Sequence, residues 1–148
     1  MEAKRDGYVI STDRARLDRE RIWEFLRTAY WATGVPRSVV DGAIEGSLCF
    51  GLYAPDGSQA GFARAVTDRA TFAWIADLFV LPDHRGRGLG VWLTETLLAH
   101  PDLQGLRRVT LATADAHGLY ERFGFVPADP ERLMDRSVPP EERYVGGG

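Results

Sequence analysis

Apolar and polar residues follow a changing pattern in the first third of the chain. Residues 8–12 alternate and are rich in β-formers, which predicts a first strand. Residues 16–30 then carry apolar positions at helical spacing, with Thr12 or Asp13 as the expected cap, and predict a helix. Pro36 is placed to begin a second helix that extends to about Glu45.

The middle of the chain has the pattern of three successive strands. Residues 47–54 and 59–68 flank the turn sequence Pro55–Ser58, which predicts a hairpin. Residues 71–81 are apolar on both faces, as is typical of a strand at the centre of a sheet.

The second half alternates between helical and strand-like segments. We expect a helix over 88–99, a strand over 106–113, a short helix over 115–123 and the start of another strand over 124–127. Asp115 is the expected cap of the short helix, and Gly124 fits the position just past its end. The proline-rich tail is expected to be loose, including the final glycines, with part of it as a last strand.

This order of elements predicts one mixed α+β domain over residues 1–148, with a core of about 8–138 and a loose C-terminal tail. The sheet should be mixed and mostly antiparallel, with a βα crossover in its second half and helices packed on it. Exposed sheet edges leave a homodimer as an open alternative.

Composition narrows the class of protein. The chain has 148 residues, 45% of them hydrophobic, and a formal net charge of -3, so no basic excess points to nucleic acid. No stretch approaches the roughly 20 apolar residues of a membrane span, and no leader-like segment opens the chain, so a cytoplasmic protein is expected. The single Cys49 lies in an apolar run, which favours a buried inert thiol over a nucleophile.

The stretch "LPDHRGRGLGV" (81–91) is the strongest chemical signal in the sequence. A glycine-rich turn that opens a helix binds anions through free backbone N–H groups and the helix dipole, and Arg85 and Arg87 add charge. The alternative is a tight turn with solvated arginines, but Gly86, Gly88 and Gly90 exceed what a turn needs. The spacing fits neither a Walker loop nor a dinucleotide fingerprint.

Two motifs together point to a family. Val80 and Pro82 are followed by Arg85, Gly88 and Gly90, and "AHGLYERFGF" stands at 116–125. This pair resembles the acyl-CoA loop and the following segment of the GCN5-related N-acetyltransferase (GNAT) superfamily. The resemblance runs from about residue 8 to 134 and implies a GNAT-type acyl-CoA N-acyltransferase fold.

The resemblance implies acetyl-CoA as co-substrate and no metal. The cofactor's pyrophosphate is expected on the loop, and its pantetheine arm is expected to pair with the strand before it. These expected cofactor contacts are Leu78, Phe79, Val80, Arg85, Gly86, Arg87, Gly88, Leu89, Gly90 and Val91.

Tyr120 matches the family tyrosine that protonates the departing thiolate. The alternative is a core tyrosine packed beside Phe123. Seven residues before it, where many relatives carry Asn, this chain has Thr113, which weakens a side-chain contact to pantetheine there.

The attacking amine must also lose a proton, because a lysine-like amine is neutral only about once in 2,500 molecules at pH 7. Asp77, an acid within the apolar "WIADLFV", is the candidate base. The alternative is a carboxylate satisfied by hydrogen bonds at a bulge. His117 and Asp115 are lesser candidates.

On the acceptor side, Tyr30 and Trp31 either wall a pocket or close the core. Arg64 shares a strand face with Phe62 and Val66, and it should face an acidic group of the substrate or an internal Asp.

The sequence therefore predicts an enzyme that moves an acetyl or short acyl group from acyl-CoA to a primary amine of a small molecule or a protein, by direct attack in a ternary complex. A non-catalytic acyl-CoA sensor on the same fold is the alternative. An ATP- or NAD-binding protein is disfavoured by the loop spacing.

Overall fold

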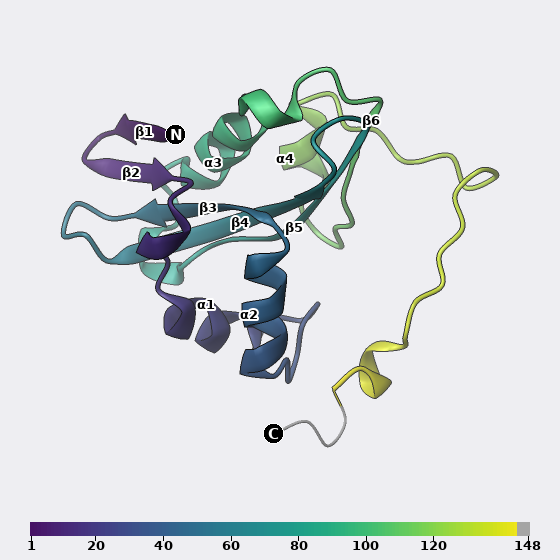
Figure 1. The fold of residues 1–148 in the computed structure, drawn as a ribbon, viewed down its shortest axis with the longest axis horizontal. Coiled ribbons are helices and arrows are strands. Elements are labelled where there is room, and N and C mark those ends of the chain that lie inside the picture. Colours follow the sequence, from purple (N-terminus) through teal and green to yellow (C-terminus); the bar gives the residue numbers. More distant parts are fainter. Residues whose placement is uncertain (145–148) are drawn as a thin grey trace.

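The strands of the sheet lie side by side in the order in which they follow along the chain. The computed structural model describes residues 1–144, drawn as a ribbon in Figure 1. Neighbouring strands are antiparallel except β5 and β6, which run parallel. The strands are β1 (Glu2–Arg5), β2 (Tyr8–Ser11), β3 (Leu48–Tyr53), β4 (Gln59–Thr67), β5 (Phe72–Val80) and β6 (Arg108–Thr110).

Helices cover both faces of the sheet. α1 (Arg19–Leu26) and α2 (Arg37–Glu45) lie on one face, and α3 (Leu89–Leu98) and α4 (His117–Glu121) lie on the other (Figure 1). Each face has its own core cluster, one shared with α1 and α2 and one shared with α3. The expected α+β fold with a mostly antiparallel sheet is confirmed.

The N-terminal strand β1 was not predicted. Glu2, Ala3, Lys4 and Arg5 are poor strand formers, but the next two residues form a tight hairpin turn with positive φ, 52° at Asp6 and 83° at Gly7. Positive φ at both central residues is the geometry of the type I′ turn, for which Asp-Gly is a preferred sequence. The sheet therefore begins at Glu2.

Other expected elements are shorter or absent. The helix expected over 16–30 extends only over Arg19–Leu26, because the Asp18 side chain caps it and turns follow. The strand expected over 106–113 is limited to Arg108–Thr110. Asp115 does not cap α4: its cap residue is Ala116, whose N–H donates to the Thr113 hydroxyl at 3.0 Å.

The strand expected over 124–127 is wrong, since these residues form no strand in the structure and Val126 is 79% exposed. Pro127 and Pro130 remove two backbone donors from this region, which explains why it does not pair.

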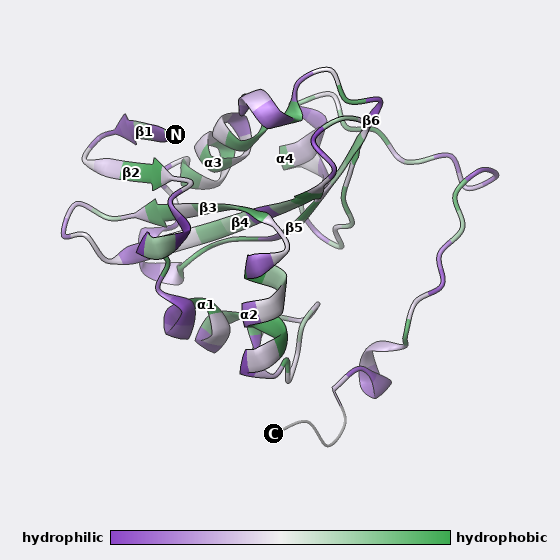
Figure 2. Ribbon diagram, viewed as in Figure 1, coloured by the Kyte–Doolittle hydropathy of each residue, from purple (hydrophilic) through white to green (hydrophobic). Residues whose placement is uncertain are grey.

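The segment after α4 leaves the sheet and returns beside the loop that follows α1 (Figure 1). Arg143 Nη1 donates to the Trp31 carbonyl at 3.4 Å, and Tyr144 packs against the cluster of α1 and α2. In Figure 2 the hydrophobic colours concentrate on the central strands, whereas β1 at the edge is mainly hydrophilic. The expectation of loose glycines falls on 146–148, outside the described residues. No helix within residues 1–144 is long and apolar enough to cross a membrane.

Candidate functional site

A bulge in β5 opens the sheet at the start of the site. The register between β4 and β5 shifts between Phe62 and Arg64, where β5 carries one extra residue, and Asp77 adopts a left-handed φ of 53°. Pairing between β5 and β6 is limited to three positions and ends at Trp74 and Thr110. Among the described residues, the rest of β5 therefore has no partner strand on that side, and its backbone groups are open to an extended ligand.

The Asp77 carboxylate is held by side chains on both of its oxygens. Arg64 Nε donates to Oδ2 at 2.7 Å, and Trp31 Nε1 donates to Oδ1 at 2.8 Å. The side chains of Arg64 and Asp77 are 18% and 14% exposed, so the pair is largely shielded from water. Arg64 Nη1 also donates to the Ser47 hydroxyl at 3.1 Å. Of the two partners expected for Arg64, the structure therefore shows the internal Asp.

The glycine-rich loop begins where β5 ends. A short 3-10 turn, Pro82–His84, is followed by Gly86 and Gly88, which have φ of 81° and 74°. Gly88 is the cap of α3 and offers no side chain to its first turn, so the first N–H groups of α3 lack a partner within the helix. Positive φ at two positions explains why glycine stands there.

A cavity of about 350 Å³ lies over this loop. The lining residues are Val80, His84, Arg85, Gly86, Gly88, Leu89, Gly90, Val91, Leu119 and Arg122. Seven of the ten residues expected to contact the cofactor line it; Leu78, Phe79 and Arg87 do not. Phe79 instead stacks on Phe25 of α1 with ring centroids 4.1 Å apart.

His84, Leu119 and Arg122 line the loop cavity but were not singled out from the sequence. Leu119 of α4 and its C-cap Arg122 are three residues apart within the "AHGLYERFGF" motif, so helical spacing places both on the same side. That spacing was the available signal. Arg85 Nε donates to the Val80 carbonyl at 2.9 Å, so this side chain folds back on the strand end.

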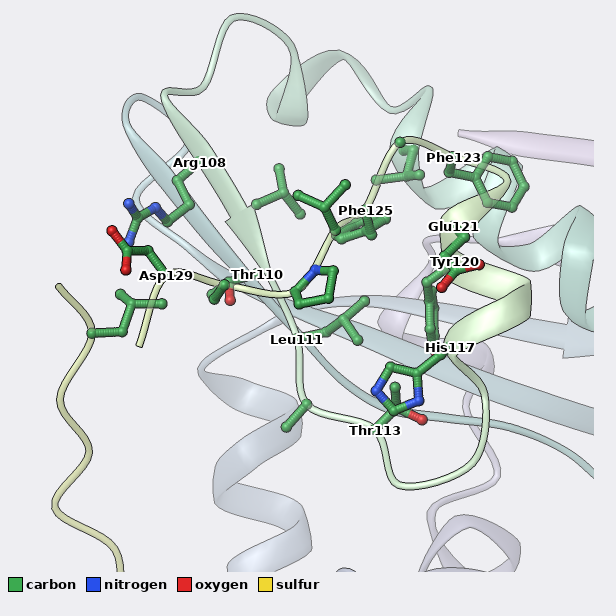
Figure 3. Close-up of a pocket in the computed structure, with 18 residues that line it drawn as sticks. Arg108, Thr110, Leu111, Thr113, His117, Tyr120, Glu121, Phe123, Phe125 and Asp129 are labelled. Carbon is green, nitrogen blue, oxygen red and sulfur yellow. The ribbon is translucent and has the colours of Figure 1, made fainter. Parts of the chain in front are cut away.

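A second and larger cavity, of about 800 Å³, lies on another side of α4 and is drawn in Figure 3. His117, Tyr120 and Glu121 of α4 contribute to its lining, together with residues after β6 such as Thr113. Tyr120 is 9% exposed, and burial is the main cause that raises the pKa of its phenol. Its ring also packs edge-on against Phe125 at 5.8 Å. The aromatic partner of Tyr120 is therefore Phe125 and not the expected Phe123, while its position in the cavity lining leaves the acid role as a prediction.

Two adjacent aromatic residues bridge the diverging strands. Trp31 reaches Asp77 on β5, and the Tyr30 hydroxyl accepts a hydrogen bond at 3.3 Å from the backbone N–H of Ala114, in the segment after β6. The two rings meet edge to face at 5.0 Å. We call Tyr30 and Trp31 the aromatic bridge. Tyr30 is 55% exposed, so its ring is not part of the core.

Other candidate groups have no site-like surroundings. Cys49 is buried, and burial raises the pKa of its thiol to about 11, so it is protonated and a poor nucleophile at neutral pH. Within residues 1–144, no group of three His, Cys, Asp or Glu side chains is arranged to hold a metal ion.

Comparison with known proteins identifies a family whose members resemble this chain. The model of the Acetyltransferase (GNAT) family matches residues 14–125. A Gibberella zeae protein assigned as an acetyltransferase is 34% identical, with 78% of this chain and 77% of that protein covered. A crystal structure of a protein assigned to the GNAT family, from Xanthomonas campestris pv. campestris, is 51% identical, with 90% of this chain and 94% of that chain covered and a TM-score of 0.87.

A structure from meticillin-resistant Staphylococcus aureus is 21% identical, covers 89% of this chain and 99% of its own, and has a TM-score of 0.72. At that identity the likeness shows the fold alone.

The contacts of Asp77 predict a large effect on stability. Asp77→Ala leaves the Arg64 guanidinium without its carboxylate, so the free energy of unfolding should fall by about 3 kcal/mol, measured by urea denaturation. Asp77→Asn tolerates the left-handed backbone better and isolates the effect of the charge. Ala at the exposed Glu24 is the control and should change stability by less than about 0.5 kcal/mol. An Asp77→Ala protein as stable as the control would contradict the importance of this pair.

Proposed function

This chain belongs to the GNAT family of acetyltransferases and is an acyl-CoA-dependent N-acetyltransferase; we propose that it acetylates a primary amine, of a small molecule or exposed on a protein, by direct attack in a ternary complex. One observation carries the proposal. α4 and its C-terminal cap line both the loop cavity, through Leu119 and the cap residue Arg122, and the larger cavity, through Tyr120. A cofactor with phosphates at one end and a thioester at the other fits a site divided in this way.

Acetyl-CoA enters this proposal as the co-substrate implied by the family, and its thioester supplies the acetyl group. The free N–H groups at the start of α3 bind the pyrophosphate, where the helix dipole also favours negative charge. The open edge of β5, including Leu78, Phe79 and Val80, pairs through its backbone with the pantetheine arm. Their side chains need not line the cavity for this role.

Tyr120 assists the departure of the sulfur by donating a hydrogen bond to it. Its pKa is raised by burial above the ordinary phenol value of about 10, so the phenol is fully protonated throughout the neutral range. A thiol has a pKa of about 8.5, below that of the phenol, so complete proton transfer from Tyr120 to the departing thiolate is unfavourable. The phenol therefore stabilises the negative charge that develops on the sulfur through its hydrogen bond.

Asp77 was the candidate base, and that role stays a prediction. Its contacts favour positioning instead, because Arg64 and Trp31 already occupy both carboxylate oxygens. In this proposal Asp77 holds the bulge and the aromatic bridge in place, and the amine loses its proton to water. Neutralising a lysine-like amine at pH 7 then accounts for about 4.6 kcal/mol of the barrier.

The aromatic bridge forms the acceptor side of the site. Trp31 anchors the loop after α1 on β5, and Tyr30 presents an exposed ring and hydroxyl beside the segment that carries Thr113. Arg64 acts through Asp77 and not on the acceptor, because its Nε and Nη1 groups are bonded within the protein.

The first test is calorimetric titration with acetyl-CoA, with ATP and NAD as controls. We expect acetyl-CoA to bind with a micromolar dissociation constant and ATP and NAD not to bind. Thiol release should then occur with at least one amine from a panel of amino acids, polyamines, amino sugars and lysine peptides. Binding with no turnover on any amine would favour the sensor alternative. No binding at all would contradict the proposed use of the loop.

Tyr120→Phe tests the acid. It removes the donor and keeps the ring contact with Phe125, so kcat on the amine found in that panel should fall by about 100-fold or more. The dissociation constant of acetyl-CoA should stay unchanged. Tyr53→Phe is the control, because that phenol is also buried but lies outside both cavities. Unchanged turnover in Tyr120→Phe would rule out the acid role.

Asp77→Asn separates the two roles of that residue. If Asp77 only positions, the variant keeps the shape of the wild-type profile of kcat against pH, and the loss is similar at every pH. If Asp77 is the base, kcat at pH 7 falls by about 100-fold or more and recovers as pH rises and the amine neutralises itself. The measurement is the pH dependence of thiol release between pH 6 and 9.

A further inference from the structure

The hairpin of β1 and β2 contacts the glycine-rich loop at two points. Arg5 and Tyr8 are direct partners across the hairpin, so their side chains lie on the same face of the sheet. The Tyr8 hydroxyl is hydrogen-bonded to His84 Nδ1 at 2.9 Å. Arg5 Nη2 lies 3.9 Å from the point that a Cβ atom on Gly88 would occupy. A strand from the far edge of the sheet thus places a cation at the start of α3.

The position of Arg5 is electrostatically unfavourable in the absence of an anion. The start of a helix carries partial positive charge, and a cation beside it is destabilising. Arg85 and Arg122 line the cavity at the same place, and Arg87 lies within the loop. The acid nearest to Arg5 is its neighbour Asp6, whose carboxylate is 4.0 Å from Nε and 89% exposed. An exposed acid at that distance offsets little of this charge.

Arg5 is not among the residues that line the loop cavity, in which the pyrophosphate is proposed to bind. It approaches Gly88 from the side of the hairpin, with its side chain 48% exposed. An anion bound by Arg5 is therefore a second one, next to the first. Coenzyme A has this arrangement of charge, with a pyrophosphate and a separate phosphate on the ribose.

We propose that Arg5 binds the ribose 3′-phosphate of coenzyme A and makes the site selective for the fully phosphorylated cofactor. This inference rests on the proposed function, because it places the pyrophosphate on the loop. Nothing in the two sequence motifs points to Arg5, which lies outside the stretch that matches the family model.

The rival role for Arg5 is packing. Its guanidinium carbon lies 5.9 Å from the centroid of the Trp92 ring, within the range of a weak cation–π contact. The two roles predict opposite signs for the stability of the free protein. A packing residue stabilises the unliganded chain, whereas a residue that adds to uncompensated positive charge does not.

The experiment compares Arg5→Gln with Lys4→Gln as the matched control. Lys4 is adjacent on the same strand, is 75% exposed, points to the opposite face and loses the same charge. Calorimetry at low salt measures the dissociation constants of coenzyme A and of 3′-dephospho-coenzyme A for both variants and the wild type.

Arg5→Gln should weaken the binding of coenzyme A about fivefold, which is the size expected for one half-exposed ion pair. The binding of 3′-dephospho-coenzyme A should not change, and Lys4→Gln should match the wild type with both ligands. The melting temperature of free Arg5→Gln should equal or exceed that of the wild type, and its rise on adding coenzyme A should be smaller.

Equal losses with both ligands, or no loss with either, would overturn the proposal. The proposal would also be overturned if free Arg5→Gln melted at a lower temperature than the wild type and coenzyme A raised its melting temperature as much as that of the wild type. That outcome is the one expected if Arg5 only packs against Trp92. If the proposed function itself is wrong, the wild-type protein will bind neither coenzyme A nor 3′-dephospho-coenzyme A, so the titrations of the wild type distinguish that failure from failure of the Arg5 proposal.

Discussion

The ion pair between Asp77 and Arg64 is the contact on which the rest of the site depends. A left-handed backbone at a residue other than glycine costs about 1–2 kcal/mol, and Asp77 adopts it in the middle of a strand. The conformation is maintained because Arg64 and Trp31 hold the side chain from two directions. The resulting bulge interrupts β5 just after its pairing with β6 ends, and the open strand edge beyond it is where the cofactor is proposed to bind.

α3 and α4, which lie on the same face of the sheet, divide the site into two cavities. α3 directs free N–H groups to the loop cavity, and α4 lies between that cavity and the larger one that holds Tyr120. The chain as a whole is acidic, with a net charge of -3, yet Arg85 and Arg122 line the loop cavity and Arg5 approaches Gly88 at the start of α3. Local charge, and not the balance of the whole chain, therefore indicates the kind of ligand.

Local features of this site could be predicted from the sequence, whereas its long-range contacts could at most be narrowed, as for Arg64, whose internal Asp was one of two expected partners. The loop, α3 and the glycine after α4 follow from turn and capping preferences within a few residues. The partners of Asp77 are 13 and 46 residues away, and no periodicity connects them to it. Asp6 and Gly7 form a sequence that favours a hairpin turn and so indicates β1, but the polar residues before the turn do not have the pattern of a strand. The strand expected over 124–127 failed for the opposite reason, because its apolar residues outweighed the prolines.

The two ends of the aromatic bridge explain why the acceptor side of the proposed site is less firmly defined by the fold than its cofactor side. Trp31 is tied to a shielded carboxylate by a 2.8 Å hydrogen bond, so one end of the bridge is fixed by the same ion pair that forms the bulge. Tyr30, by contrast, makes a longer contact with a backbone N–H and is largely exposed. A change at Tyr30 or in its loop would alter the proposed acceptor surface and leave the bulge, the open strand edge and the glycine-rich loop intact. On the proposed assignment of the acceptor side, acceptor choice is set by a surface loop on a fixed frame, and likeness of fold alone does not carry it from one protein to another.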